Sequence, residues 1–109
     1  YEAVRAAFPD VDVEVEVTTV AEAEEAYGVG ARFIMCDNMS PSLLRETVAR
    51  LRDLSAIDGQ RVEVEATGGL TLEVVREYAL TGVDYLSVGG LTHSSPIVDI
   101  ALDLAEEKR

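Results

Sequence analysis

The sequence predicts an α/β protein made of four consecutive parallel βα units, which form the C-terminal half of an α/β barrel. Two patterns predict it: short alternating or β-branched runs recur four times along the 109 residues, and an amphipathic helical run follows each of them. Strands separated by helices run parallel, because the crossover helix carries the chain back to the same end of the sheet. A doubly wound sheet obeys the same rule. Four units make half of a barrel, whose usual length is about 250 residues.

We expect residues 1–109 to be one partial barrel domain, cut from a longer polypeptide. The chain has no initiator methionine and begins inside a predicted helix over residues 1–8. A half-barrel by itself would leave two open strand edges, which proteins usually avoid. The first part of the barrel is therefore expected to lie outside this sequence.

The first unit has a strand and a capped helix. Residues 11–17 alternate valine with aspartate or glutamate, which is the period of a strand. Thr19 and Glu22 match a capping box, in which each side chain accepts a hydrogen bond from the backbone N–H of the other residue. We expect the helix to run to about Tyr27, where glycines stop it.

The second unit repeats this order. A strand over residues 32–36 is followed by Ser40, which caps the next helix, and by Pro41, which suits the first helical turn. Residues 55–60 are predicted to be a polar loop. The buried stripe of this helix follows helical spacing and consists of Leu44, Val48 and Leu51.

The third and fourth units complete the chain. A strand over residues 62–66 precedes a helix that Thr71 caps and that runs through about Leu80. A strand over residues 84–88 precedes a last helix starting at Ser95. The apolar face of that helix consists of Ile97, Ile100, Ala101 and Leu104.

Composition excludes several classes of protein. No run of about 18 apolar residues is present and the start does not look like a signal peptide, so we expect no membrane span and a cytoplasmic location. Cys36 is the single cysteine, which excludes an internal disulfide and fits a reducing compartment. Its place in a predicted strand indicates a buried, unreactive thiol.

The chain is strongly acidic. Its formal charge is −12, from 21 acidic and 9 basic residues, which argues against nucleic acid as a partner because such a surface needs a basic patch. A phosphorylated ligand would need either a bound Mg²⁺ or basic residues on another segment. Solubility and adaptation to high salt are further explanations of the acidity that the sequence leaves open.

Two glycine pairs indicate an anion site. Gly68-Gly69 and Gly89-Gly90 each follow a strand and precede a helical run, so backbone N–H groups there can approach a bound anion. Barrels often bind phosphate with the loops of their last two units. Two tight turns that hold nothing are the alternative. His93 precedes a helix start and would donate to a phosphate, act as an acid, or only cap a turn.

Carboxylates interrupt the predicted strands, which is unusual for a parallel sheet covered on both faces. Asp12, Glu14 and Glu16 share one face of the first strand, and Glu16, Asp37 and Glu65 lie at or next to three successive strand ends. At the wet mouth of a barrel, Glu16 and Asp37 would bind Mg²⁺ through water, contact sugar hydroxyls, or stabilise positive charge on a sugar ring. A solvated acidic strand face is the alternative, and it accounts well for Asp12.

Four motifs, in register across almost the whole chain, resemble one enzyme family. They are EVEV at 14–17, CDNMSP at 36–41, EATGGLT at 65–71 and TGVDYLSVGGLTHS at 81–94. Together they are similar to the quinolinate phosphoribosyltransferases, also called nicotinate-nucleotide pyrophosphorylases (carboxylating). Two small departures keep the character of the motifs: Thr67 stands where the family commonly has serine, and Gly90 where it commonly has alanine.

The resemblance implies the C-terminal part of a TIM-like α/β barrel. It also implies an enzyme of NAD biosynthesis, a pentosyltransferase that converts quinolinate and phosphoribosyl pyrophosphate to nicotinate mononucleotide, pyrophosphate and CO₂ with Mg²⁺. The parent protein is expected to form a dimer or larger homo-oligomer. The family's N-terminal sandwich domain and its basic cluster for the quinolinate carboxylates would lie upstream, so the 109 residues alone are expected to be inactive.

The resemblance also implies roles for individual residues. Glu16 and Asp37 would lie at the ribose and Mg²⁺ end of the site as catalytic residues. The loops around the 5′-phosphate would consist of Thr67, Gly68, Gly69, Gly89, Gly90 and His93. Further candidates for the site are Glu14, Asn38 and Glu65.

Three other interpretations remain open at the level of sequence. A nicotinate phosphoribosyltransferase, or a relative with another substrate, would share the phosphate loops and lack the basic cluster. A non-catalytic half-barrel would bind phosphoribosyl compounds without turning them over. A structural αβ module would show no stabilisation by Mg²⁺ or phosphate.

Overall fold

The computed structural model describes residues 1–91 and contains one four-stranded parallel sheet with the strand order β1-β2-β3-β4. This confirms the predicted α/β class and the four consecutive parallel strands, of which the first three are each followed by an α-helix within residues 1–91. The strands are β1 Glu14–Val17, β2 Phe33–Asp37, β3 Glu63–Thr67 and β4 Tyr85–Leu86. The helices are α1 Glu2–Ala7, α2 Val20–Gly28, α3 Pro41–Asp58, α4 Val75–Ala79 and the short 3₁₀ helix η1 Gly89–Leu91.

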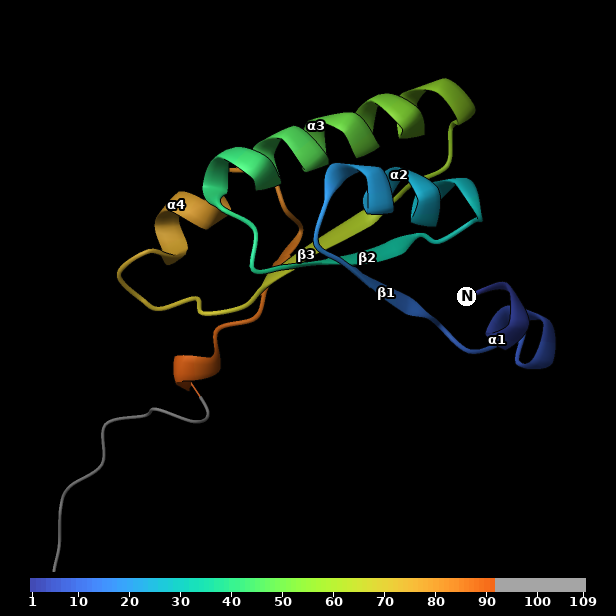
Figure 1. The fold of residues 1–109 in the computed structure, drawn as a ribbon, viewed down its shortest axis with the longest axis horizontal. Coiled ribbons are helices and arrows are strands. Elements are labelled where there is room, and N and C mark those ends of the chain that lie inside the picture. The colour runs from blue at the N-terminus through green and yellow to red at the C-terminus, as the bar shows by residue number, and fades with distance from the viewer. Residues whose placement is uncertain (92–109) are drawn as a thin grey trace, which may run out of the picture.

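The helices α2, α3 and α4 all lie on one side of the sheet, and none of them covers the other, open face (Figure 1). Alternation along the strands decides which side chains meet the helices. Ile34, Cys36, Val64 and Ala66 point into the helical layer and are at most 1% exposed. Leu44, Val48 and Leu51 of α3 meet them, as predicted.

The predicted helix starts of the first two units are confirmed. The Thr19 hydroxyl accepts from the Glu22 N–H while the Glu22 carboxylate accepts from the Thr19 N–H, which is the expected capping box. The Ser40 side chain caps α3 by accepting from the Leu43 N–H at 3.3 Å, and Pro41 occupies the first turn. These local signals position α2 and α3 over the sheet.

The polar loop predicted over residues 55–60 is wrong in its first part. Helix α3 continues through Asp58, and Gly59 ends it with a left-handed φ of 72°. The Ser55 hydroxyl donates to the Gln60 carbonyl at 2.7 Å, which ties the last turn to the chain that follows. The glycine, rather than the polar composition before it, stops the helix.

Helix α4 is shorter than the predicted helix from Thr71 to Leu80. The Thr71 carbonyl accepts from the Val74 and Val75 N–H groups, but no side chain within residues 1–91 caps α4. A side-chain hydrogen bond with Thr71 lowers the pKa of Glu73. Thr71 therefore closes a turn, and the regular helix begins only at Val75.

The outer strands are also shorter than predicted. Pairing begins at Glu14 with Phe33, so the preceding residues 11–13 have no partner in the sheet. At the other edge only Tyr85 and Leu86 pair with β3. Alternation in sequence marks an extended chain, but strand length depends on the neighbour that supplies hydrogen bonds.

Two predicted features lie outside the described residues, namely His93 and the helix expected from Ser95. Among the helices of residues 1–91, none is long and apolar enough to cross a membrane.

Candidate functional site

Several acidic side chains lie on the open face of the sheet. The strand register places Glu16, Met35 and Glu65 in one row across β1, β2 and β3. The next row on the same face, one step closer to the strand ends, holds Asp37 opposite Thr67. The structure therefore brings Glu16, Asp37 and Glu65 to one end of one face, where the sequence placed them.

Glu14 and Glu65 interact on this face. Burial, the negative charge of Glu65 and a side-chain hydrogen bond with Glu65 together raise the pKa of Glu14. The Ser87 hydroxyl also donates to Glu65, and the Oε1 atom of Glu14 is buried without a hydrogen-bond partner among residues 1–91.

Asp37 lies at the last position of β2 and is oriented by its neighbour. The Asn38 side-chain amide donates to the Asp37 Oδ2 atom at 2.9 Å. The Asn38 N–H donates to the Thr67 carbonyl at 3.0 Å, which joins the ends of β2 and β3. Asn38 adopts a φ of 52°, a left-handed conformation that asparagine tolerates better than most residues.

The first glycine pair serves two different purposes. A Cβ atom at Gly68 would lie 2.6 Å from the Asn38 side chain, so packing between the two loops requires glycine there. Gly69 has a φ of 63°, and a Cβ atom there would meet nothing within 4 Å. The backbone at Gly69 is thus the part of this turn that a ligand can approach.

The second glycine pair begins η1, directly after β4. A Cβ atom at Gly89 or Gly90 would meet nothing within 4 Å. The space beside both glycines is therefore unoccupied by other described residues. Packing within residues 1–91 therefore does not explain why both positions are glycine.

Ion pairs within residues 1–91 avoid the carboxyl end of the sheet. Glu63, one row closer to the amino end, pairs with Arg61 at 3.0 Å. No ion pair within residues 1–91 includes Glu16, Asp37 or Glu65. Within residues 1–91, no cationic side chain therefore neutralises these three carboxylates.

The donor set suits a hard cation bound through water. The described residues contain no group of three or more His, Cys, Asp or Glu side chains that could hold a metal ion directly. Mg²⁺ commonly keeps several waters and takes only one or two protein carboxylates, together with phosphate oxygens of a substrate. Glu16 and Asp37 fit that mode of binding and do not form an all-protein cage.

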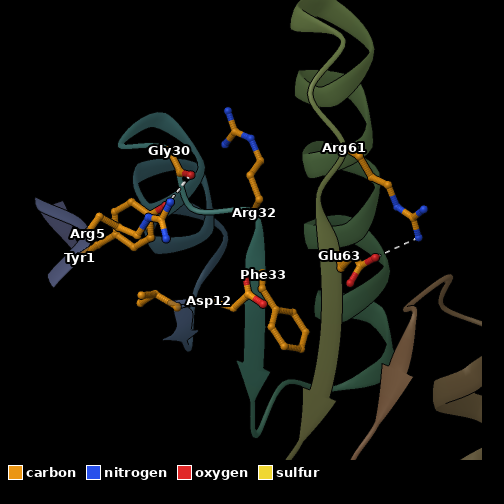
Figure 2. Close-up of a pocket in the computed structure, with 9 residues that line it drawn as sticks. Tyr1, Arg5, Asp12, Gly30, Arg32, Phe33, Arg61 and Glu63 are labelled. Carbon is orange, nitrogen blue, oxygen red and sulfur yellow. Dashed lines mark hydrogen bonds and ion pairs between the residues drawn. The ribbon is translucent and has the colours of Figure 1, made fainter. Parts of the chain in front are cut away.

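A pocket of about 510 Å³ lies away from these residues, at the amino end of the sheet (Figure 2). Three arginines line it, but their guanidinium groups point apart. Arg5 donates to the Val11 carbonyl, Arg32 to the Tyr27 and Ala31 carbonyls, and Arg61 pairs with Glu63. The guanidinium groups of all three arginines therefore already have partners within the protein. A second hollow of about 350 Å³ lies beside β1 and includes Glu16.

Sequence reasoning missed two hydroxyl groups that hold the site. Ser87 binds Glu65, and Tyr78 of α4 donates to the Met39 carbonyl at 3.1 Å. The position of Ser87 at a strand end, two residues before a glycine pair, was an available signal. Nothing in the sequence points to the contact between Tyr78 and Met39, because 39 residues separate them.

Comparisons with known proteins agree with each other. Residues 1–103 match the family model described as the C-terminal domain of quinolinate phosphoribosyl transferase. The chain is 43% identical over 102 residues to the nicotinate-nucleotide pyrophosphorylase (carboxylating) of Mycobacterium leprae, covering 94% of this chain and 34% of that protein. It is 38% identical over 102 residues to the rat protein of the same name, covering 94% and 32%.

A solved structure gives the same result for the fold. The nicotinate-nucleotide pyrophosphorylase from Francisella tularensis superposes with a TM-score of 0.76 at 28% identity, covering 90% of this chain and 33% of that one. The chain spans about a third of the length of the curated relatives it matches.

Proposed function

The chain belongs to the quinolinate phosphoribosyl transferase family, and from that premise we propose that it forms the phosphoribosyl-binding part of an enzyme that makes nicotinate mononucleotide. The substrates would be quinolinate and phosphoribosyl pyrophosphate, and the products would include pyrophosphate and CO₂. The family membership confirms the resemblance that the four sequence motifs predict. The activity belongs to the complete protein, because this chain covers only a third of its relatives.

The arrangement of Glu16, Asp37 and the Gly68-Gly69 turn at one end of the open face carries this proposal. Carboxylates and a glycine turn on neighbouring strand ends suit a ligand with both a sugar and a phosphate. The turn would take the 5′-phosphate and the carboxylates would face the ribose. Gly89, Gly90 and His93 are predicted to complete the phosphate loop.

The reaction would proceed at C1 of the ribose. Pyrophosphate leaves with the electrons of its bond to C1, the pyridine nitrogen of quinolinate forms a new bond there, and CO₂ leaves the adjacent ring carbon, which takes up a proton. Positive charge develops on the sugar as pyrophosphate departs. Glu16 and Asp37 would stabilise that charge and orient the sugar, because both are carboxylates and no ion pair within residues 1–91 includes them.

Mg²⁺ is the cofactor that we propose. Glu16 and Asp37 would hold it through water, and it would neutralise the pyrophosphate oxygens. Its presence would also explain how so acidic a chain binds a ligand with several negative charges.

We further propose that the complete protein works in the cytoplasm as a homo-oligomer. The single, buried Cys36 suits a reducing compartment, and burial raises the pKa of its thiol to about 11. The oligomer follows from the family resemblance alone. The native mass of the complete protein, compared with its denatured mass, tests it; a native mass equal to one chain would contradict it.

Release of CO₂ tests the proposed reaction. The complete protein should release labelled CO₂ from carboxyl-labelled quinolinate only when phosphoribosyl pyrophosphate and Mg²⁺ are both present. Nicotinate is the matched alternative substrate, because its conversion to the nucleotide releases pyrophosphate without CO₂. Turnover of nicotinate with none of quinolinate would replace the proposal by a nicotinate phosphoribosyltransferase, and turnover of neither would indicate a binding module.

A further inference from the structure

Asn38 connects two loops of the site through three separate contacts. Its side-chain amide donates to the Asp37 Oδ2 atom at 2.9 Å, and its backbone N–H donates to the Thr67 carbonyl at 3.0 Å. Its side chain also occupies the space beside Gly68 that a Cβ atom would need. One residue thus contacts both the carboxylate and the glycine turn.

The chain around Asn38 is fixed from a third direction. Met39 follows it, is 3% exposed, and accepts a hydrogen bond from Tyr78 through its carbonyl. The Thr47 hydroxyl of α3 lies 3.4 Å from the Met39 sulfur. Asn38 is itself exposed, so burial does not account for its side-chain contacts.

A turn residue alone would not need this side chain. Glycine adopts a φ of 52° more readily than asparagine, and aspartate tolerates it about as well as asparagine does. What distinguishes asparagine is a donor for Asp37 combined with an uncharged oxygen against Gly68.

We propose that Asn38 is a positioning residue, which holds the Asp37 carboxylate and the Gly68 turn in one arrangement so that they bind the phosphoribosyl ligand as a unit. This inference rests on the proposed function. Asn38 acts through Asp37 and the turn. Groups that orient a ligand-binding carboxylate typically contribute about 10- to 100-fold in affinity or activity.

Two variants of the complete protein separate the side chain from the backbone. Asn38→Gly keeps the left-handed backbone and removes the amide, while Asn38→Asp keeps the size and places a like charge beside Asp37. We expect kcat/KM for phosphoribosyl pyrophosphate to fall about 10- to 100-fold in Asn38→Gly and further in Asn38→Asp. The KM for quinolinate should stay within about twofold, since the family resemblance places its binding groups elsewhere.

Several outcomes would overturn the inference. If Asn38 only shapes the turn, both variants will keep the wild-type kcat/KM for phosphoribosyl pyrophosphate. If it only supports the fold, the KM values for both substrates will rise together and the urea midpoint will drop. Either result removes the positioning role.

Failure of the proposed function can be told apart from failure of this inference. If the wild-type protein releases no CO₂ from quinolinate, the function falls, and calorimetric titration with Mg²⁺ and phosphoribosyl pyrophosphate decides about Asn38. Tighter binding to wild type than to Asn38→Gly supports the positioning role. Equal binding, or no binding to wild type, overturns it.

Discussion

The two ends of the sheet differ in whether their carboxylates form ion pairs within residues 1–91. At the amino end, Arg52 of α3 donates to the Val62 and Gly82 carbonyls and pairs with Asp84 at 2.8 Å. Asp84 also accepts from the Val64 N–H at 2.8 Å. At the carboxyl end, no arginine within residues 1–91 reaches Glu16, Asp37 or Glu65.

The pKa values of Asp84 and Glu14 shift in opposite directions. Burial disfavours the charged form of Asp84, but hydrogen bonds from Arg52 and Val64 outweigh it and leave the pKa lowered. Burial and the nearby Glu65 raise the pKa of Glu14, which lies on the open face in the row of Glu63. Arg52 thus stabilises the charge of Asp84, whereas the open face places Glu14 and Glu65 close together.

The loops at the two ends of the sheet also differ. At the amino end, the residues with a left-handed backbone are Gly30, Gly59 and Gly82. Each of them follows a helix, and glycine is the residue that most commonly ends a helix in this conformation. At the carboxyl end they are Asn38, Gly68 and Gly69, which follow strands. This contrast supports the proposal that the carboxyl end binds the ligand while the amino end maintains the fold.

The largest expected effect is on activity, at the carboxyl end. Glu16→Gln in the complete protein should lower kcat about 10²- to 10³-fold, because one anionic group no longer faces the charge that develops on ribose. The fold should not change, since Glu16 is exposed and has no ion pair within residues 1–91. CO₂ release and the urea midpoint measure the two quantities.

Glu63→Gln is the matched control for that variant. Glu63 lies on the same face, one row closer to the amino end, and pairs with the exposed Arg61. Its loss should leave kcat almost unchanged. Equal losses of kcat in Glu16→Gln and Glu63→Gln would erase the proposed difference between the two ends.

The next effect separates the two glycines of the first turn. Gly69→Ala should reduce the free energy of unfolding by about 1–2 kcal/mol, since only backbone strain opposes it. Gly68→Ala should reduce it by about 1–3 kcal/mol more, because the new methyl group must displace Asn38. Urea unfolding of both variants provides the measurement. Equal losses would mean that the loops do not pack closely.

A smaller effect is expected at the amino end, on stability alone. Arg52→Met keeps much of the side-chain length but removes the guanidinium donors to the Asp84 carboxylate and the Val62 carbonyl, so we expect a loss of about 1–2 kcal/mol in urea unfolding. Arg50→Met is the control, because its partner Glu24 and Arg50 are both on the surface. Turnover per folded molecule should be unchanged in both. A loss of turnover in Arg52→Met would show that the ends are coupled.

The smallest effect concerns pH. A lowered pKa in the folded state means that Asp84 stabilises the fold above its unfolded pKa of about 4, and that this contribution is lost as pH falls. Arg52 and the more distant Arg61 are the charges that favour its ionised form. The stability gap between wild type and Arg52→Met should therefore narrow as pH falls from about 5 to about 3. A gap that widens would contradict this assignment.

Local signals in the sequence were enough for much of the fold. The Thr19–Glu22 capping box, Pro41 and the stripe of Leu44, Val48 and Leu51 each report on residues three or four positions apart, so the chain specifies them without tertiary information. The order of elements then implied parallel strands, and motifs at successive strand ends identified the family.

Other features depended on partners far away in the sequence. Residues 11–13 alternate as a strand should, yet pairing starts only where β2 begins, at Glu14 opposite Phe33. The close contact between Asn38 and Gly68 also depends on residues from two loops that are distant in the sequence. By itself the sequence determined which residues stand at the strand ends, because strand period and turn residues are local properties. Only the tertiary structure decided which of them meet, because strand pairing brings together residues about 30 positions apart.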